Sequence, residues 1–478
     1  MVRRRIDASH VIAYQDGGHR HLRDGVVVTE GNEIVHVGRD FAGEVDETID
    51  ARGMVVTPGF INTHAHLYES PLDKSFVEDK GRRQFYLSGL FEYLPVRSMA
   101  MGDEDARACL AYSMAELLRT GTTTVMEIGS YAEDAIREAG KVGLRLYMGL
   151  GYRSGRWYTD DGKEVKYAWD EEAGLRGLQR AVDVIERHAG SQNDRIRGFL
   201  SPSQVDTCTE DLLRRSRQAA DSLGVPMALH TSQSVNEFLE ITRRHGKTPI
   251  EWLRDIGFLG PDVILGHAII LAPGSWTNWP GDDVGILADT GTNVAHCVWV
   301  FARRGIVMES FSRYLARGVN MTLGTDTCPQ SMIDGLRWTA VASKIVDRQT
   351  EVATAGDVFN AATLAGARAL GRDDLGRIAP GAKADLLLWR GDSLFMTPLR
   401  DPIRNLVYSA AAEDLDTVII DGEVRMQGRE IPGVNVAQLA ADLQAAGERM
   451  WSKVPQGDWA GRGIEELAPS TFPEYEVG

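Results

Sequence analysis

The segment Pro58-Gly-Phe-Ile-Asn-Thr-His-Ala-His66 decides the fold of this 478-residue chain. After a Pro-Gly turn it reads as a short apolar strand that ends in two histidines, His64 and His66. Because residues i and i+2 of a strand point to the same face, the two imidazoles can converge on one ion. A second His-x-His pair, at 19–21, lies in a polar hairpin and is interpreted as surface side chains.

Seven further apolar runs follow this strand and alternate with helical patterns, among them 104–120, 171–188, 210–223 and 235–245. Eight strand-helix units over roughly 310 residues predict an α/β fold, a (β/α)8 TIM barrel. A doubly wound open sheet is the alternative, but no glycine-rich phosphate turn follows the first strand. The eight expected strands are 60–64, 123–127, 144–148, 196–200, 227–230, 263–267, 293–296 and 320–324.

Short strands separated by turns also occur near both ends of the chain. Neither group has enough strands to bury a face alone, so we expect them to pair into one small β-sandwich domain. The expected domains are this composite sandwich (1–58 and 373–435), the barrel (59–372), and a C-terminal helix and tail (436–478). The C-terminal helix could pack on the barrel or on a neighbouring subunit.

The composition excludes several classes of partner. The formal net charge is −16 and the pI about 5.2, so the chain lacks the basic surface that nucleic acid requires. The four cysteines are scattered, the N-terminus lacks the apolar core of a signal peptide, and no apolar run reaches the ~20 residues that span a bilayer. We therefore expect a cytoplasmic protein that contacts no membrane.

Four more residues with ligand-type side chains stand at the ends of the later strands. His230 ends the fifth, His267 the sixth and His296 the seventh, and Asp326 follows the eighth. A barrel gathers such residues at the carboxyl ends of its strands. Imidazoles together with a carboxylate suit Zn²⁺, which we predict, and also Fe²⁺ or Mn²⁺. A cation there would activate water near neutral pH, which makes hydrolysis the expected chemistry.

The segment 58–66 resembles the signature that opens the barrel in the amidohydrolase superfamily. Gly381-Ala-Lys-Ala-Asp-Leu386 resembles the return of that family into its β-sandwich. Asp401-Pro-Ile-Arg-Asn-Leu-Val-Tyr408 resembles the branch with triazine hydrolases, chlorohydrolases, nucleobase deaminases and phenylurea or thiocarbamate hydrolases. The likeness covers nearly the whole chain and implies a metal-dependent enzyme that cleaves C–N bonds other than peptide bonds.

The resemblance also implies a role for each strand-end residue. His64, His66, His230 and Asp326 would bind the metal, and Asp326 would also take the proton of the attacking water. His267 would polarise the substrate or hold the water, and His296 would face the substrate. Leu200-Ser-Pro-Ser203 lacks the lysine that bridges two metals in other members, so one divalent ion is expected.

One departure from the pattern concerns the reaction itself. Deaminases and dechlorinases of the branch carry His-x-x-Glu after the fifth strand, where this chain has His230-Thr-Ser-Gln233. An amide has no titratable proton near neutral pH, so Gln233 can orient a substrate but cannot act as a general acid or base. We therefore expect attack at a carbonyl carbon, as in an amide, urea or carbamate, with Asp326 moving the proton.

Aromatic residues after His66 point to the substrate. Phe85, Phe91 and Tyr93, with Trp157 from a second long loop at 152–169, belong to loops that would overhang the barrel mouth. They suit a small aromatic or apolar substrate, although the same rings could simply pack the loops.

Two alternatives stay open. The first is an aminohydrolase or dechlorinase of a heteroaromatic ring such as a triazine, pterin or nucleobase, in which another group replaces the glutamate. The second is a non-catalytic scaffold, which has no use for a complete set of metal ligands. The sequence is compatible with a homo-oligomer, and no residue specifies one.

Overall fold

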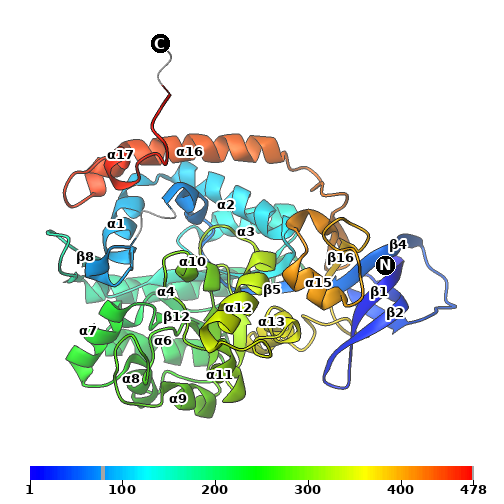
Figure 1. The fold of residues 1–478 in the computed structure, drawn as a ribbon, viewed down its shortest axis with the longest axis horizontal. Coiled ribbons are helices and arrows are strands. Elements are labelled where there is room, and N and C mark those ends of the chain that lie inside the picture. Colours follow the sequence, from blue (N-terminus) through cyan, green and yellow to red (C-terminus); the bar gives the residue numbers. More distant parts are fainter. Residues whose placement is uncertain (77–80, 476–478) are drawn as a thin grey trace.

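The computed structural model describes residues 1–76 and 81–475 (Figure 1). Its central strands form two parallel sheets of consecutive strands. The first has the order β10-β7-β6-β5, with β11 also paired to β7, and the second has the order β12-β13-β14-β15. The strands are β5 (Phe60–Ala65), β6 (Thr122–Gly129), β7 (Arg145–Tyr152), β10 (Ile196–Gly198), β11 (Ser201–Pro202), β12 (Met227–Thr231), β13 (Val263–His267), β14 (Asn293–His296) and β15 (Met321–Leu323).

The two parallel sheets are hydrogen-bonded to each other at both margins. At one margin Ala65 forms a parallel bridge with Asp326, and the Asp326 N–H donates to the His64 carbonyl at 2.9 Å. At the other, Leu200 bridges Met227. All eight predicted strands are present, and the fourth is divided into β10 and β11. The structure thus brings the first strand next to the eighth.

Helices follow most of these strands and cover the outside of the sheets (Figure 1). In α6, for example, Thr209 caps the first turn and Leu212, Leu213, Ser216 and Ala220 form the buried stripe. The helices around the sheets are α1 (Leu90–Ala100), α2 (Asp103–Arg119), α3 (Ala132–Val142), α4 (Glu171–His188), α5 (Ser191–Asp194), α6 (Glu210–Leu223), α7 (Val235–His245), α8 (Pro249–Asp255), α9 (Asp283–Thr290), α10 (Val298–Ala302), α11 (Phe311–Ala316), α12 (Met332–Asp347), α13 (Ala355–Ala361) and α14 (Leu364–Ala369).

The segment 152–169, expected to be a loop, contains a hairpin of β8 (Gly155–Tyr158) and β9 (Lys166–Trp169). The hairpin is anchored by Asp206 in the short 3-10 helix η3 (Val205–Thr207), which accepts hydrogen bonds of 2.7 Å each from Trp157 Nε1 and Tyr167 OH. Strands of four residues carry little periodicity, so the sequence pattern alone does not reveal them.

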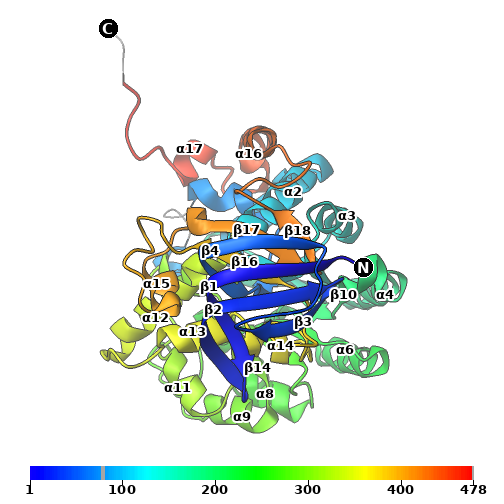
Figure 2. The same cartoon turned by 90° about the vertical axis from the view of Figure 1, so that its right-hand side faces the viewer.

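Segments from both chain ends form one antiparallel-rich sheet of seven strands (Figure 2). The order is β18-β17-β16-β4-β1-β2-β3, and β16 pairs antiparallel with β4. The sequence predicts a two-sheet sandwich, whereas the structure has this single sheet. The strand register shifts, for example between Ala8 and His10, and such irregularities allow the sheet to bend around its own core. The strands are β1 (Arg3–Gln15), β2 (Gly18–Glu30), β3 (Glu33–Gly38), β4 (Glu47–Pro58), β16 (Leu386–Arg390), β17 (Leu415–Ile420) and β18 (Glu423–Met426).

A buried ion cluster joins the seven-stranded sheet to the parallel strands. The guanidinium of Arg145, at the start of β7, binds Asp385 at 2.7 Å and Asp421 at 2.6 Å. Asp385 directly precedes β16 and Asp421 directly follows β17. Removing one partner of such a group leaves a buried charge uncompensated, so the cluster fixes how the two parts meet.

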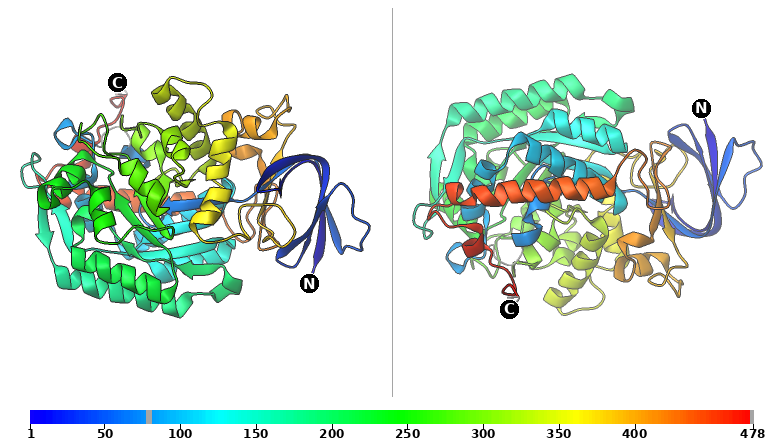
Figure 3. Two further views of the ribbon diagram at one scale, coloured as in Figure 1. Left: turned by 90° about the horizontal axis from the view of Figure 1, so that it is seen from below. Right: turned by 90° about the horizontal axis from the view of Figure 1, so that it is seen from above.

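The C-terminal helix α16 (Val436–Gly457) packs on this chain's own α1 and α2, across which it runs in Figure 3. Ala446 and Met450 join the apolar cluster of Cys109, and Arg449 Nε donates to Asp105 at 2.7 Å. Two further short helices are α15 (Pro402–Tyr408) and α17 (Ile464–Leu467). Across the described ranges, no helix combines the length and apolarity needed to cross a bilayer.

Candidate metal centre and active site

The predicted strand-end residues meet because neighbouring parallel strands are in register. His230 pairs with Gly266, Thr231 with His267, and His296 with Leu323. Each strand therefore delivers its last imidazole to the same edge, and the Ala65–Asp326 bridge brings the β5 histidines there as well.

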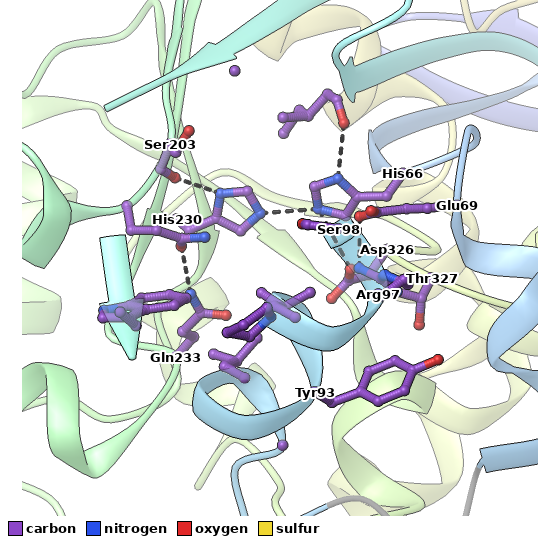
Figure 4. Close-up of a pocket in the computed structure, with 18 of the residues that line it drawn as sticks. His66, Glu69, Tyr93, Arg97, Ser98, Ser203, His230, Gln233, Asp326 and Thr327 are labelled. Carbon is purple, nitrogen blue, oxygen red and sulfur yellow. Dashed lines mark hydrogen bonds and ion pairs between the residues drawn. The ribbon is translucent and has the colours of Figure 1, made fainter. Parts of the chain in front are cut away.

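Close distances connect the members of this group (Figure 4). His66 Nε2 lies 3.0 Å from His230 Nε2 and 3.7 Å from Asp326 Oδ1. His267 Nε2 lies 3.6 Å from Asp326 Oδ2. The His64 ring centroid is 4.6 Å from that of His230 and 4.8 Å from that of His267. Four imidazoles and one carboxylate thus surround a single small volume.

The hydrogen bonds behind the rings set their tautomers. Nδ1 of His66 lies 2.8 Å from the Ile128 carbonyl, and Nδ1 of His230 lies 2.6 Å from the Ser203 carbonyl. A carbonyl only accepts, so both Nδ1 atoms carry the proton and both Nε2 atoms present lone pairs. Two lone pairs that face each other at 3.0 Å are stable when a cation binds both. The geometry therefore fits a divalent metal.

Burial keeps these imidazoles in the neutral, coordinating form. Desolvation lowers the pKa of His64 and of His267 well below its usual range and that of His230 to about 3. Both ring nitrogens of His64 are enclosed without a hydrogen-bond partner within the described residues. A buried polar atom left without a partner is costly, and a metal ion would satisfy it.

The same burial acts on the other members of the site. It raises the pKa of Asp326 above its usual value and lowers that of His296 to about 4. His296 is 3% exposed, its ring lies 5.5 Å from Phe311, and it stands behind the cavity rather than among its lining residues. Cys297, which the sequence analysis did not single out, lies within ligand distance of His64, His267 and Asp326. Burial raises its pKa well above the usual thiol value, so it is a poor ligand.

Gln233 lines the cavity beside the histidines (Figure 4). Its Nε2 donates to Gln204 Oε1 at 2.6 Å, so two neutral amides occupy this wall. Its backbone N–H donates at 3.4 Å to the buried carboxylate of Glu237, which also accepts from the Ser232 N–H. Glu237 therefore holds the loop after β12, and the Ser234 side chain caps α7 by accepting from the Glu237 N–H at 3.2 Å.

A cavity of about 840 Å³ opens above the cluster, large enough for a drug-sized molecule. Of the four predicted substrate residues, Tyr93 and Trp157 line it. Phe91 and Phe85 are fully buried and lie outside its lining; the Phe91 ring contacts Trp157 at 5.2 Å, and Phe85 packs behind Phe91. These two phenylalanines support the wall from behind.

A buried charge network in this wall was not anticipated from the sequence. Arg97, on α1, binds Asp73 at 2.7 Å and Glu69 at 2.6 Å, and all three line the cavity. Figure 4 shows Arg97 and Glu69. Arg97 is 3% exposed. The sequence signal is an arginine next to Val96 in a helix that is largely apolar and aromatic apart from Glu92 and Ser98, where an unpaired buried charge would be unfavourable.

These features define a class: a hydrolase whose strand-end histidines and aspartate suit a divalent metal. The model of the amidohydrolase family matches residues 55–425, so the chain belongs to that family. It is 31% identical over 415 residues to 5'-deoxyadenosine deaminase of Methanothermobacter thermautotrophicus, covering 86% of this chain and 91% of that protein. It is 30% identical over 411 residues to 5-methylthioadenosine/S-adenosylhomocysteine deaminase of Thermococcus onnurineus, covering 85% and 90%.

Solved structures agree in fold. An adenosine deaminase from Xanthomonas campestris with bound zinc superposes with a TM-score of 0.79 at 23% identity, covering 94% of this chain and 98% of its own. Atrazine chlorohydrolase from Arthrobacter aurescens, complexed with zinc, gives 0.79 at 23% identity, covering 93% and 100%. The predictions of the family and of a hydrolytic enzyme acting on C–N bonds are confirmed, as is that of a divalent-metal enzyme.

Proposed function

We propose that the protein hydrolyses a C–N bond next to a carbonyl group, as in an amide, urea or carbamate of a small, partly aromatic molecule. The observation that carries this proposal is the wall opposite Asp326, where Gln233 and Gln204 present neutral amides hydrogen-bonded to each other. Amide groups orient a substrate through hydrogen bonds and transfer no proton near neutral pH.

The acidic residues that line the cavity, within the part of the chain that the structure describes, support the same assignment. Glu69 and Asp73 are both held by Arg97, so neither is a free proton carrier. That leaves Asp326, whose carboxylate lies among the histidines. Carbonyl hydrolysis needs one group that takes a proton from water and gives it to the leaving nitrogen, and a carboxylate at this position can do both.

His64, His66, His230 and Asp326 would hold a divalent metal, for which we propose zinc; when bound it would supply Lewis acidity and lower the pKa of water. The residues of the chain then divide the remaining work. His267 Nε2, 3.6 Å from Asp326, faces the space where a carbonyl oxygen would lie and can hold it or the water. Gln233 and Gln204 orient the substrate, and Trp157 and Tyr93 exclude water around it. His296 would support His267 from behind the cavity.

The same proposal covers the architecture. We infer that the two parallel sheets, which are hydrogen-bonded at both margins, constitute one (β/α)8 barrel at 59–372. The seven-stranded sheet, from 1–58 and 373–435, and the C-terminal segment 436–478 would be its accessory parts.

The test is a product screen by mass spectrometry on two substrate panels with the metal-loaded enzyme. One panel holds aryl ureas, anilides and carbamates, and the other holds amino- and chloro-substituted heteroaromatics together with 5'-deoxyadenosine. We expect turnover in the first panel. Turnover confined to the second would overturn the proposal.

Ring deamination is the second candidate, because two relatives at 31% and 30% identity are named as deaminases. Gln233→Glu separates the two functions by supplying the missing carboxylate. We expect this variant to gain deamination while carbonyl hydrolysis falls. Gln233→Met, similar in size but unable to form hydrogen bonds, is the control and should lower carbonyl hydrolysis without any gain in deamination. Efficient deamination by the unmodified enzyme would favour the second candidate.

A further inference from the structure

Arg304 extends from the segment that follows α10 into the same cavity as the histidine cluster. Its backbone N–H donates to the Phe301 carbonyl at 2.9 Å, which fixes the turn after the helix. The Phe301 ring in turn packs against His267, with ring centroids 4.6 Å apart. The position of this guanidinium relative to the metal centre is therefore set by a short, well-packed segment.

Arg304 differs from its neighbours because its guanidinium has no hydrogen-bond or ion-pair partner within 1–76 and 81–475. The side chain is partly buried and its Nε is enclosed without a partner. The adjacent Arg303 donates to the Cys328 carbonyl at 2.8 Å and to Thr327 Oγ1 at 3.2 Å. Arg97, on the opposite wall, is neutralised by two carboxylates. Asp73 and Asp326 attract this guanidinium only from beyond ion-pair distance. A desolvated cation that no carboxylate contacts directly is unfavourable, so Arg304 would gain from an anionic ligand.

The charge of Arg304 already acts on the centre. Burial is the main cause that lowers the pKa of His267, and the charges of the neighbouring histidines and of Arg304 add to it. Arg304 is also among the charges that act on Asp326. Arg304 and Asp326 line the same cavity, so one small molecule can contact both.

We propose that Arg304 determines substrate specificity by binding a carboxylate on the substrate, at the end of the molecule away from the bond that is cleaved. A guanidinium forms two parallel hydrogen bonds with a carboxylate, which fixes orientation as well as adding affinity. The other cavity arginines without a partner within the described ranges, Arg153 and Arg156, are exposed, so water screens their charge. The inference rests on the proposed function, because it assigns the substrate's second end.

The experiment compares two ligands of nearly equal shape on the metal-loaded enzyme, 4-aminobenzoate and 4-aminobenzamide, by isothermal titration calorimetry. We expect the carboxylate to bind about tenfold more tightly or better than the carboxamide. Arg304→Gln should bring the ratio of the two dissociation constants close to one, and Arg304→Lys should retain part of it. Arg156→Gln, which removes an exposed charge at the rim, is the matched control and should leave the ratio unchanged.

Equal binding of the two ligands by the unmodified enzyme would overturn the proposal, as would a preference that survives in Arg304→Gln, since the carboxylate would then be bound elsewhere. Loss of the preference in Arg156→Gln alone would also overturn it.

Turnover of phenylurea and 4-ureidobenzoate is measured in parallel. An Arg304-dependent binding preference without hydrolysis of either urea, or of any aryl urea, anilide or carbamate in the panel, would contradict the proposed function and leave the carboxylate site standing. Hydrolysis of the ureas without a preference for the carboxylate ligand would support the proposed function and overturn the carboxylate site at Arg304.

Discussion

The floor and the wall of the cavity are built in different ways. The floor consists of strand-end residues such as His230 and Asp326, and the register of neighbouring strands places them. The wall consists of α1 and the β8–β9 hairpin, held by buried polar contacts such as Arg97 with Asp73 and Trp157 with Asp206. The strand ends therefore place the groups that carry out the chemistry, whereas the insertions between strands determine the shape of the substrate site.

Among the floor residues, Asp326 should show the largest loss of activity on substitution, and the test is Asp326→Asn. The amide keeps the shape of the carboxylate but cannot take a proton, so we expect kcat to fall about 10²–10⁴-fold. Circular dichroism should show an unchanged fold. Asp211→Asn, an exposed aspartate on α6 paired with Arg215, is the control and should retain full activity. Retention of full turnover by Asp326→Asn would contradict the assignment.

Removal of the metal tests the floor as a whole. Chelation should abolish activity and lower the thermal midpoint, because an ion that binds only the folded state stabilises it. Added Zn²⁺ should restore both. Unchanged activity after dialysis against a chelator, with elemental analysis confirming that the protein is metal-free, would rule out the proposed centre.

Arg97→Met tests the wall through stability. It leaves Glu69 and Asp73 buried without their partner, so we expect the free energy of unfolding to fall by roughly 3–5 kcal/mol in denaturant titration. Arg176→Met removes an exposed pair with Glu172 and should change stability by less than about 1 kcal/mol. Similar effects of the two substitutions would mean that the wall network contributes little.

Asp206→Asn examines how the hairpin is anchored. Burial raises the pKa of Asp206 to about 6, above its unfolded value of 3.8, so the folded state binds the proton more tightly. The resulting stabilisation is complete below about pH 4 and is lost as pH rises through 6. Stability of the unmodified protein should thus decline over that range by about 3 kcal/mol relative to Asp206→Asn, as read from unfolding midpoints. Parallel pH profiles would show that Asp206 does not titrate as described.

The floor could be predicted from the sequence and most of the wall could not. Strand ends are marked by local patterns, so the sequence alone can predict that one edge of the strands gathers His64, His66, His230, His267, His296 and Asp326. Arg97 and Glu69 lie 28 residues apart, and no local pattern connects them. Asp206 and Arg304 acquire their surroundings only through tertiary packing. The single seven-stranded sheet likewise contains register shifts, as between Ala8 and His10, that the sequence does not display.

The aromatic residues illustrate the same limit. Phe85, Phe91, Tyr93 and Trp157 were equally plausible from sequence, yet only Tyr93 and Trp157 reach the cavity, and the two phenylalanines are buried behind them. Apolar side chains near a site either line it or support it, and packing decides which.

The central claim is that the strand-end cluster holds a catalytic divalent metal. Elemental analysis of the purified protein and of His230→Ala tests it most directly. The account predicts about one divalent ion per chain, with zinc the expected element, and loss of that ion in His230→Ala, because the lone pair facing His66 is removed. An unmodified enzyme that hydrolyses C–N bonds without bound metal, or a variant that retains the ion in full, would contradict it.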